Sequence, residues 1–186
     1  MPGPVRTSLV LSCVFAITLV ATAAAVRQHQ PNDRITGLRV GEMAPVDGLE
    51  VTVKAMDALT PRLTQAVAGG EVDVGMRGFR VVVGVRNPGP GPRALGPLVK
   101  RFQVVQVDGG RPPGAEVRSP FTSSALLTAE GRALYRRVPA SVGPGEKVTG
   151  VLLAIVPKWA IVGGCLWVGP DGPAWTLAPG PNQRHL

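Results

Sequence analysis

The sequence predicts an all-β fold, an antiparallel sandwich or barrel, preceded by one N-terminal hydrophobic helix. Short runs in which apolar and polar residues alternate predict the strands, and Gly- and Pro-rich turns separate these runs. An uncharged apolar stretch near the start of the chain predicts the helix. The 186 residues have room for one ordinary domain plus an end segment. The 24 glycines and 19 prolines exclude a coiled coil and an α-solenoid.

Residues 1–26 predict a signal peptide or a single transmembrane anchor. No charge occurs between Arg6 and Arg27, and at about 1.5 Å per helical residue this run matches a bilayer core of roughly 30 Å. The short n-region and the alanines at positions 21, 23 and 25 fit a cleavable secretory signal equally well. A lipid-modified Cys13 is rejected because the apolar run continues well beyond it.

The charges around this segment disagree about the side of the membrane on which the domain lies. Arg27, Arg34 and Arg39 follow the apolar run and only Arg6 precedes it, which the positive-inside rule counts against export. Whole domains translocate largely regardless of such charges. We therefore expect an extracytoplasmic protein, either secreted or tethered to the cell membrane by the N-terminal segment if it is uncleaved.

The rest of the chain divides into a stalk, a domain and a tail. Residues 27–33 are polar and predict a short stalk, residues 34–178 predict the β-sandwich domain, and residues 179–186 predict a flexible tail. Alternation turns Phe79, Val81, Val83 and Val85 inward. Segment 60–78 is expected to be irregular, with one helical turn near 62–67. Strands are expected over residues 38–43, 49–55, 79–85, 99–107, 133–138, 148–156, 165–168 and 174–177.

No set of residues predicts catalysis, a cofactor or a metal. His29 lies in the stalk and His185 next to the C-terminus, and a preorganised site is not built on such ends. Cys165 stands in apolar surroundings and is interpreted as a core residue, not a nucleophile. Glu71 and Asp73 could form a carboxylate pair or a weak Ca²⁺ site, but acids in a Gly-rich loop are more often simply solvated. We expect a protein that is not an enzyme and has no cofactor.

The basic charge does not predict a nucleic-acid partner. The net charge is +8, yet the only adjacent basic pairs are 100–101 and 136–137, and the chain has few aromatic residues for base stacking. The loop 89–96 superficially resembles a phosphate cradle, but Pro90 and Pro92 remove two of the N–H donors that a cradle needs. We interpret it as a rigid turn.

Several segments, taken in order, resemble one family. They are VGE at 40–42, GLEVTV at 48–53, FRVVVGVRN at 79–87, VDG at 107–109, VGPGEKVTG at 142–150 and VLLAIVP at 151–157. This order is similar to the telokin-like, immunoprotective extracellular antigen-type domains of Gram-positive bacteria, actinobacteria among them. The resemblance covers residues 40–177 and implies an exported immunoglobulin-like β-sandwich with no catalytic residues to transfer. A Pro/Gly-rich loop at 88–97 and a long central segment depart from the family and leave strand pairing between Val99 and Ala133 open.

Two functional hypotheses follow from the sequence. The first is a non-enzymatic exported or membrane-anchored cell-envelope protein that acts through its surface on another envelope or extracellular protein. The alternative is a carrier that holds a small apolar ligand between the sheets, in a cavity lined by residues such as Val81, Val83, Leu152 and Trp167. An exported hydrolase is disfavoured because the sequence supplies no nucleophile and base.

Overall fold

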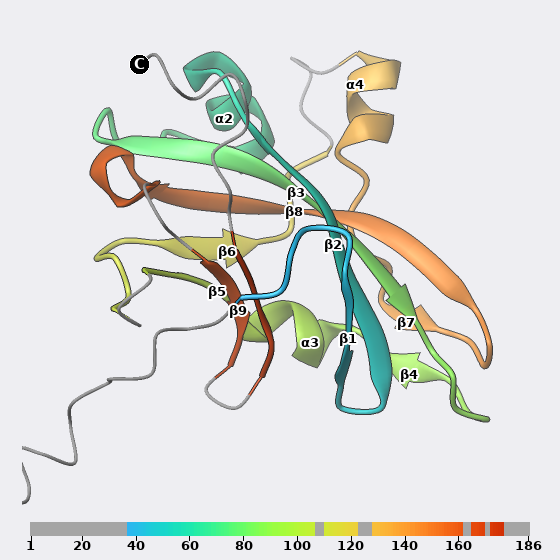
Figure 1. Ribbon diagram of the computed structural model, residues 1–186. Helices are drawn as coiled ribbons and strands as arrows, with labels where there is room; N and C mark the ends of the chain where they lie inside the picture. Colours follow the sequence, from blue (N-terminus) through green and yellow to red (C-terminus); the bar gives the residue numbers. More distant parts are fainter. Residues whose placement is uncertain (1–36, 107–109, 123–127, 162–164, 170–171, 177–186) are drawn as a thin grey trace, which may run out of the picture. The chain divides into compact units, whose positions relative to one another are not determined.

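The computed structural model describes residues 37–106, 110–122, 128–161, 165–169 and 172–176 (Figure 1). The chain separates into two units, 1–32 and 33–186, and every described residue belongs to the second. The predicted N-terminal helix, stalk and tail therefore lie outside the described residues. Among the helices that are described, none is both long and apolar enough to cross a membrane.

The alternating segments of the sequence form a five-stranded antiparallel sheet in the order β1-β2-β3-β8-β6. Its strands are β1 (Met43–Val46), β2 (Leu49–Ala58), β3 (Met76–Arg86), β6 (Glu116–Arg118) and β8 (Lys147–Pro157). Asp47 and Gly48 join β1 to β2 with left-handed φ angles of 50° and 77°, as a two-residue hairpin turn requires. The long central pair β3 and β8 is in register from Met76 opposite Pro157 to Arg86 opposite Lys147.

A second, three-stranded antiparallel sheet packs against one face of the first. Its order is β10-β9-β5, with β5 (Phe102–Val105), β9 (Cys165–Val168) and β10 (Ala174–Thr176). One buried cluster joins Val83 and Leu152 of the large sheet to Phe102 and Trp175 of the small one. Phe79, Val81, Val83 and Val85 all belong to this cluster, as the alternation predicted. The all-β sandwich fold is therefore confirmed.

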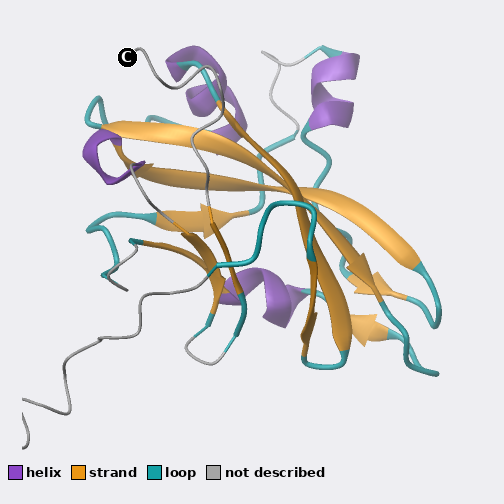
Figure 2. Cartoon of the chain, viewed as in Figure 1, coloured by secondary structure: helices purple, strands orange, loops and turns teal. Residues whose placement is uncertain are grey.

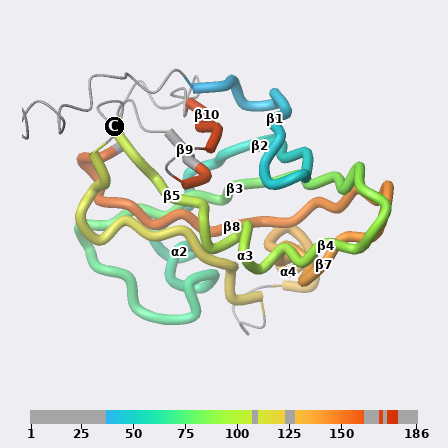
Figure 3. Tube along the Cα trace, turned by 90° about the horizontal axis from the view of Figure 1, so that it is seen from below, coloured from blue at the N-terminus to red at the C-terminus, as the bar shows by residue number. Residues whose placement is uncertain are grey.

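The start of the described chain connects the two sheets. Leu38 bridges Trp175 of β10 in the small sheet, and the chain then enters β1 in the large one (Figure 3). The indole Nε1 of Trp175, which is fully buried, donates a 2.9 Å hydrogen bond to the carbonyl oxygen of Glu42 between these two points. This crossing holds one edge of the sandwich together.

Short helices cover the opposite face of the large sheet, so that β8 is buried on both sides. Helices α2 (Pro61–Ala68) and α4 (Ala129–Leu134) lie on that side, and α3 (Gly96–Arg101) lies on the side of the small sheet (Figures 1 and 2). Ala66 and Val67 of α2 pack with Leu153 and Ile155 of β8 in a second buried cluster. Two-sided burial explains why residues 150–157 are apolar without alternation.

The strands predicted near 49–55, 79–85, 148–156, 165–168 and 174–177 are confirmed, with small shifts of their ends. The strand predicted over 99–107 is wrong in its first part: Pro97 lies in the first turn of helix α3, which ends at Arg101, and β5 follows it as an extended segment. The strand predicted over 133–138 is also wrong. Thr128 caps α4 by accepting from the Gly131 N–H at 3.1 Å, and helix-forming residues follow it.

Three short strands were not predicted, and one predicted strand is displaced. β4 (Arg93–Ala94) and β7 (Ser141–Val142) pair with each other, and β6 pairs with β8, at lengths too short for a periodic signal. The strand expected over 38–43 begins only at Met43, because Leu38 pairs with the other sheet.

Candidate binding groove beside helix α2

Helix α2 is defined by local sequence signals at both of its ends. The Thr60 hydroxyl accepts a 3.3 Å hydrogen bond from the Leu63 N–H, and Pro61 occupies the first turn, where no N–H is needed. Gly69 ends the helix with a left-handed φ of 69°. The single helical turn predicted near 62–67 is thus confirmed and is part of an eight-residue helix.

The helix approaches the sheet closely because β3 has a glycine beneath it. A Cβ at Gly78 would lie 2.5 Å from both Oγ1 and Cγ2 of Thr64, so no side chain fits between them. The Leu59 N–H donates a 2.9 Å hydrogen bond to the Gly78 carbonyl, which ties the start of the helix to the same position. Gly78 therefore sets the position of α2 over the sheet.

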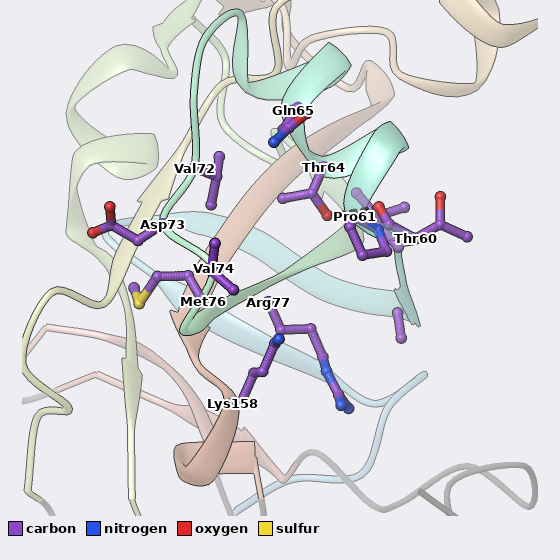
Figure 4. Close-up of a pocket in the computed structure, with 12 residues that line it drawn as sticks. Thr60, Pro61, Thr64, Gln65, Val72, Asp73, Val74, Met76, Arg77 and Lys158 are labelled. Carbon is purple, nitrogen blue, oxygen red and sulfur yellow. Dashed lines mark hydrogen bonds between the residues drawn. The ribbon is translucent and has the colours of Figure 1, made fainter.

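A groove of about 590 Å³ lies between α2, the loop that follows it, and the ends of β3 and β8 (Figure 4). Its apolar residues include Leu59, Val72 and Met76. They are partly buried and pack against the second buried cluster, the one between α2 and β8. The volume falls within the range of roughly 300–1,000 Å³ that is typical of ligand pockets. The full lining is Ala58, Leu59, Thr60, Pro61, Thr64, Gln65, Val72, Asp73, Val74, Met76, Arg77 and Lys158.

Two cationic side chains lie on the side of the groove away from α2. Figure 4 shows Arg77 and Lys158 close to each other there. Neither side chain makes an ion pair with another described residue, in contrast to Arg80 and Arg101, which pair with Asp57 and Asp47. The groove therefore combines an apolar lining with two positive charges that have no ion-pair partner in the part of the chain that the structure describes.

Large apolar side chains are exposed in the two segments that carry Val74 and Lys158 of the lining. Val74 is 89% exposed and Trp159 is 62% exposed, although both are large hydrophobic residues. Trp159 follows Lys158 in the short helix η1 (Lys158–Ile161), and the Lys158 N–H donates a 2.9 Å hydrogen bond to the Gly75 carbonyl. This bond holds η1 against the loop that carries Val74.

Of the residues that the sequence raised as possible chemical groups, the structure describes the side chains of Glu71 and Asp73. Glu71 and Asp73 are both exposed, and only Asp73 lines the groove. The described residues contain no group of three or more His, Cys, Asp or Glu side chains that could hold a metal ion. His29, His185 and Cys13 lie outside the described residues, and of Cys165 only the backbone, in β9, is described.

The loop 89–96 is held by a buried side chain, which supports its interpretation as a rigid turn. The Asn87 amide donates to the Gly91 carbonyl at 2.7 Å and to the Val142 carbonyl at 3.3 Å, and its Oδ1 accepts from the Gly89 N–H at 3.0 Å. The Gly89 N–H is thereby already used inside the protein.

The lining predicted for an apolar ligand lies elsewhere in the molecule. Val81, Val83 and Leu152 are fully buried between the two sheets and belong to one buried cluster. The groove lies on the opposite face of the large sheet, beside α2. The side chain of Trp167 lies outside the description.

Sequence reasoning missed the residues that define the groove. Arg77 and Lys158 are far apart in sequence and neither belongs to a basic pair, so no charge pattern marked them. The signal that was present is Lys158-Trp159 directly after the long apolar run of β8, where an exposed aromatic residue is out of place.

Comparison with known proteins identifies no family and no specific function. No family model and no curated protein matches the chain. A secreted protein from Mycobacterium tuberculosis, MPT63, is 15% identical with a TM-score of 0.48, over 78% of this chain and 99% of its own. An uncharacterized β-sandwich protein from Clostridium difficile is 11% identical with a TM-score of 0.46, over 78% of this chain and 95% of its own. A putative lipoprotein from Bacillus subtilis, YcdA, is 14% identical with a TM-score of 0.48 over 75% of this chain, which spans only 38% of YcdA.

Proposed function

We propose that the protein is a non-enzymatic cell-envelope module, exported or anchored by its N-terminal segment, that binds another envelope or extracellular protein at the α2 groove. The observation that carries the proposal is the apolar groove itself, whose lining includes the 89% exposed Val74. Protein interfaces are enriched in Trp, Met and Arg and depleted of charge at their centre. The groove supplies Met76 and Arg77, and the exposed Trp159 directly follows Lys158 of the lining in sequence.

The composition of the groove supports a binding role over a catalytic one. Its described lining holds one carboxylate, that of Asp73, and neither His nor Cys. Its hydroxyls, on Thr60 and Thr64, are engaged in the first turn of α2: Thr60 accepts from Leu63, and Thr64 donates to the Thr60 carbonyl at 3.0 Å. A nucleophile needs a neighbouring base to activate it, and the hydrogen bonds of these two hydroxyls run to backbone groups of the first turn and not to the Asp73 carboxylate.

The direct test is site-specific photo-crosslinking in the native cell envelope. A photoreactive amino acid at Gln65, an exposed residue of α2 that lines the groove, is expected to crosslink to a specific protein. The matched control replaces Lys147, which is exposed at the far end of β8, an 11-residue strand roughly 35 Å long. A crosslink from Lys147 but not from Gln65, or none from either, would remove the groove from the proposal.

The same proposal includes an extracytoplasmic location and membership of the telokin-like family. Its support is the targeting pattern of residues 1–26 and the ordered segments between 40 and 157. Alkaline phosphatase fused after Leu186 is expected to be active in a bacterial host, because that enzyme folds only after export. An intact, membrane-bound but inactive fusion would place the domain in the cytoplasm.

A small-ligand carrier is the second candidate, now centred on the groove and not on the space between the sheets. The volume of about 590 Å³ is the observation that favours it. Native mass spectrometry of protein purified from its own host would detect a copurifying apolar molecule. If every observed mass were that of the protein without a ligand, the result would argue against this role.

A further inference from the structure

We infer that the α2 groove binds an extended peptide segment of its partner, one that presents an apolar side chain next to a carboxylate. This inference deepens the proposed function and rests on it. Three features of the described residues carry the argument: the unpaired cations, the open backbone groups of the loop, and the apolar lining between them.

The charges select an acidic group. Arg77 and Lys158 lack ion-pair partners among the described residues, and Asp73 is the one anion of the lining. A carboxylate placed between the two cations would gain charge-assisted hydrogen bonds, of which an Arg guanidinium can supply two in parallel. A basic segment would instead bring like charges together, so complementarity also disfavours the wrong partners.

The loop wall favours a peptide over an acyl chain. The backbone N–H groups of Val72, Asp73 and Val74 donate to no other described residue, and all three residues line the groove. An extended peptide can pair with open backbone groups of this kind, as in strand addition at a sheet edge. A fatty acid matches the charge and the apolar lining but leaves these groups without a partner.

The apolar lining determines what lies beside the carboxylate. Leu59, Val72 and Met76 are partly buried and face the space between α2 and the loop. A thioether side chain adapts to differently shaped neighbours, so Met76 fits several apolar anchors better than one rigid shape. The groove therefore recognises the class, an apolar residue with an acidic neighbour, and not one particular side chain.

A selection from a random peptide library displayed on phage tests this inference, with the protein as purified from its host as the target. Wild-type protein is expected to enrich peptides that combine an apolar residue with Asp or Glu. The double variant Arg77→Glu/Lys158→Glu is expected to bind those peptides about tenfold or more weakly and to enrich Lys- or Arg-containing peptides instead. Arg132→Glu/Lys147→Glu, two exposed positions outside the groove with the same total charge change, is expected to select as the wild type does.

The outcomes separate this inference from the proposed function. Enriched peptides without acidic residues, or peptides whose binding the Arg77/Lys158 reversal leaves unchanged, would overturn the inference. Enrichment of no peptide together with a specific crosslink from Gln65 would overturn it while leaving the proposed function intact. Binding of sodium dodecanoate that depends on Arg77 and Lys158, with no peptide enriched, would assign the groove to a lipid. Should the reversal fail to fold by circular dichroism, Arg77→Gln/Lys158→Gln gives the same test through loss of affinity.

Discussion

Replacing Gly78 with Ala is expected to destabilise the protein and to displace α2 from the sheet. The new Cβ would lie 2.5 Å from Oγ1 and Cγ2 of Thr64 and 3.0 Å from its Cβ. Rotating Thr64 does not remove the contact with its Cβ, and it breaks the 3.0 Å bond from its hydroxyl to the Thr60 carbonyl. The helix must therefore move, and the groove that it borders moves with it.

The magnitude follows from three contributions. Overpacking costs about 1–3 kcal/mol and a lost hydrogen bond about 0.5–1.5 kcal/mol. Ala in place of Gly within a strand returns about 0.5–1 kcal/mol through the unfolded chain. The net loss is about 0.5–4 kcal/mol, and its central value of about 2 kcal/mol lowers the melting temperature of a domain of this size by roughly 4–8 °C, at roughly 2–4 °C per kcal/mol.

Equilibrium urea unfolding measures this loss, and a double-mutant cycle identifies its cause. In a Thr64→Ala background the two offending atoms are absent, so Gly78→Ala is expected to cost less than about 1 kcal/mol. Equal costs of Gly78→Ala in the two backgrounds would refute the reasoning, because the destabilisation would then not arise from the helix contact.

Three other substitutions test the core and its titration. Val83→Asp places an unpaired carboxylate in the buried cluster and is expected to abolish cooperative melting. Burying this charge costs several kcal/mol, which approaches a total stability of about 5–15 kcal/mol. A retained cooperative melt would contradict the strand register. Gly150→Ala brings a Cβ to 2.4 Å from Cα and 2.6 Å from N of Val138, which are backbone atoms, so calorimetry should show a larger loss than for Gly78→Ala. Burial raises the pKa of Tyr135, and the charge of nearby Arg80 offsets part of this rise. The neutral tyrosine therefore contributes fully to the stability of the folded protein below about pH 10, and this contribution is lost as pH rises through the pKa of the folded state. Tyr135→Phe should reduce this alkaline decline in urea titrations, and an unchanged decline would assign it to other groups.

Periodicity predicted the parts of the fold in which a strand is long and has one face to bury. In β3, Phe79, Val81 and Val83 alternate with less buried neighbours, and the sandwich follows from this pattern. Prediction failed where short-range signals compete with apolar content. Leu98 and Val99 are apolar enough for a strand, but Pro97 fixes the φ of a first helical turn and the segment becomes α3.

The groove was not predictable in the same way, because it depends on contacts between distant segments. Lys158 reaches it only because β8 runs the full length of β3 and ends opposite Met76. The approach of α2 depends on Gly78, and a glycine inside a strand signals a close contact without saying which segment makes it. The net charge of +8 does not reveal that Arg77 and Lys158 lack an ion-pair partner among the described residues.

The two sides of the groove are positioned by different parts of the fold. The long pair β3 and β8 positions one side. Arg77 lies within β3 and Lys158 directly follows β8, so the cationic side is fixed by the central ladder, where Arg77 is opposite Val156. The opposite side is α2, held at Gly78, and only the loop 69–75 between them lacks ladder or helix hydrogen bonds. A partner therefore meets charges that the ladder has already positioned. Binding does not require the sheet to move, which keeps the entropic cost of association low.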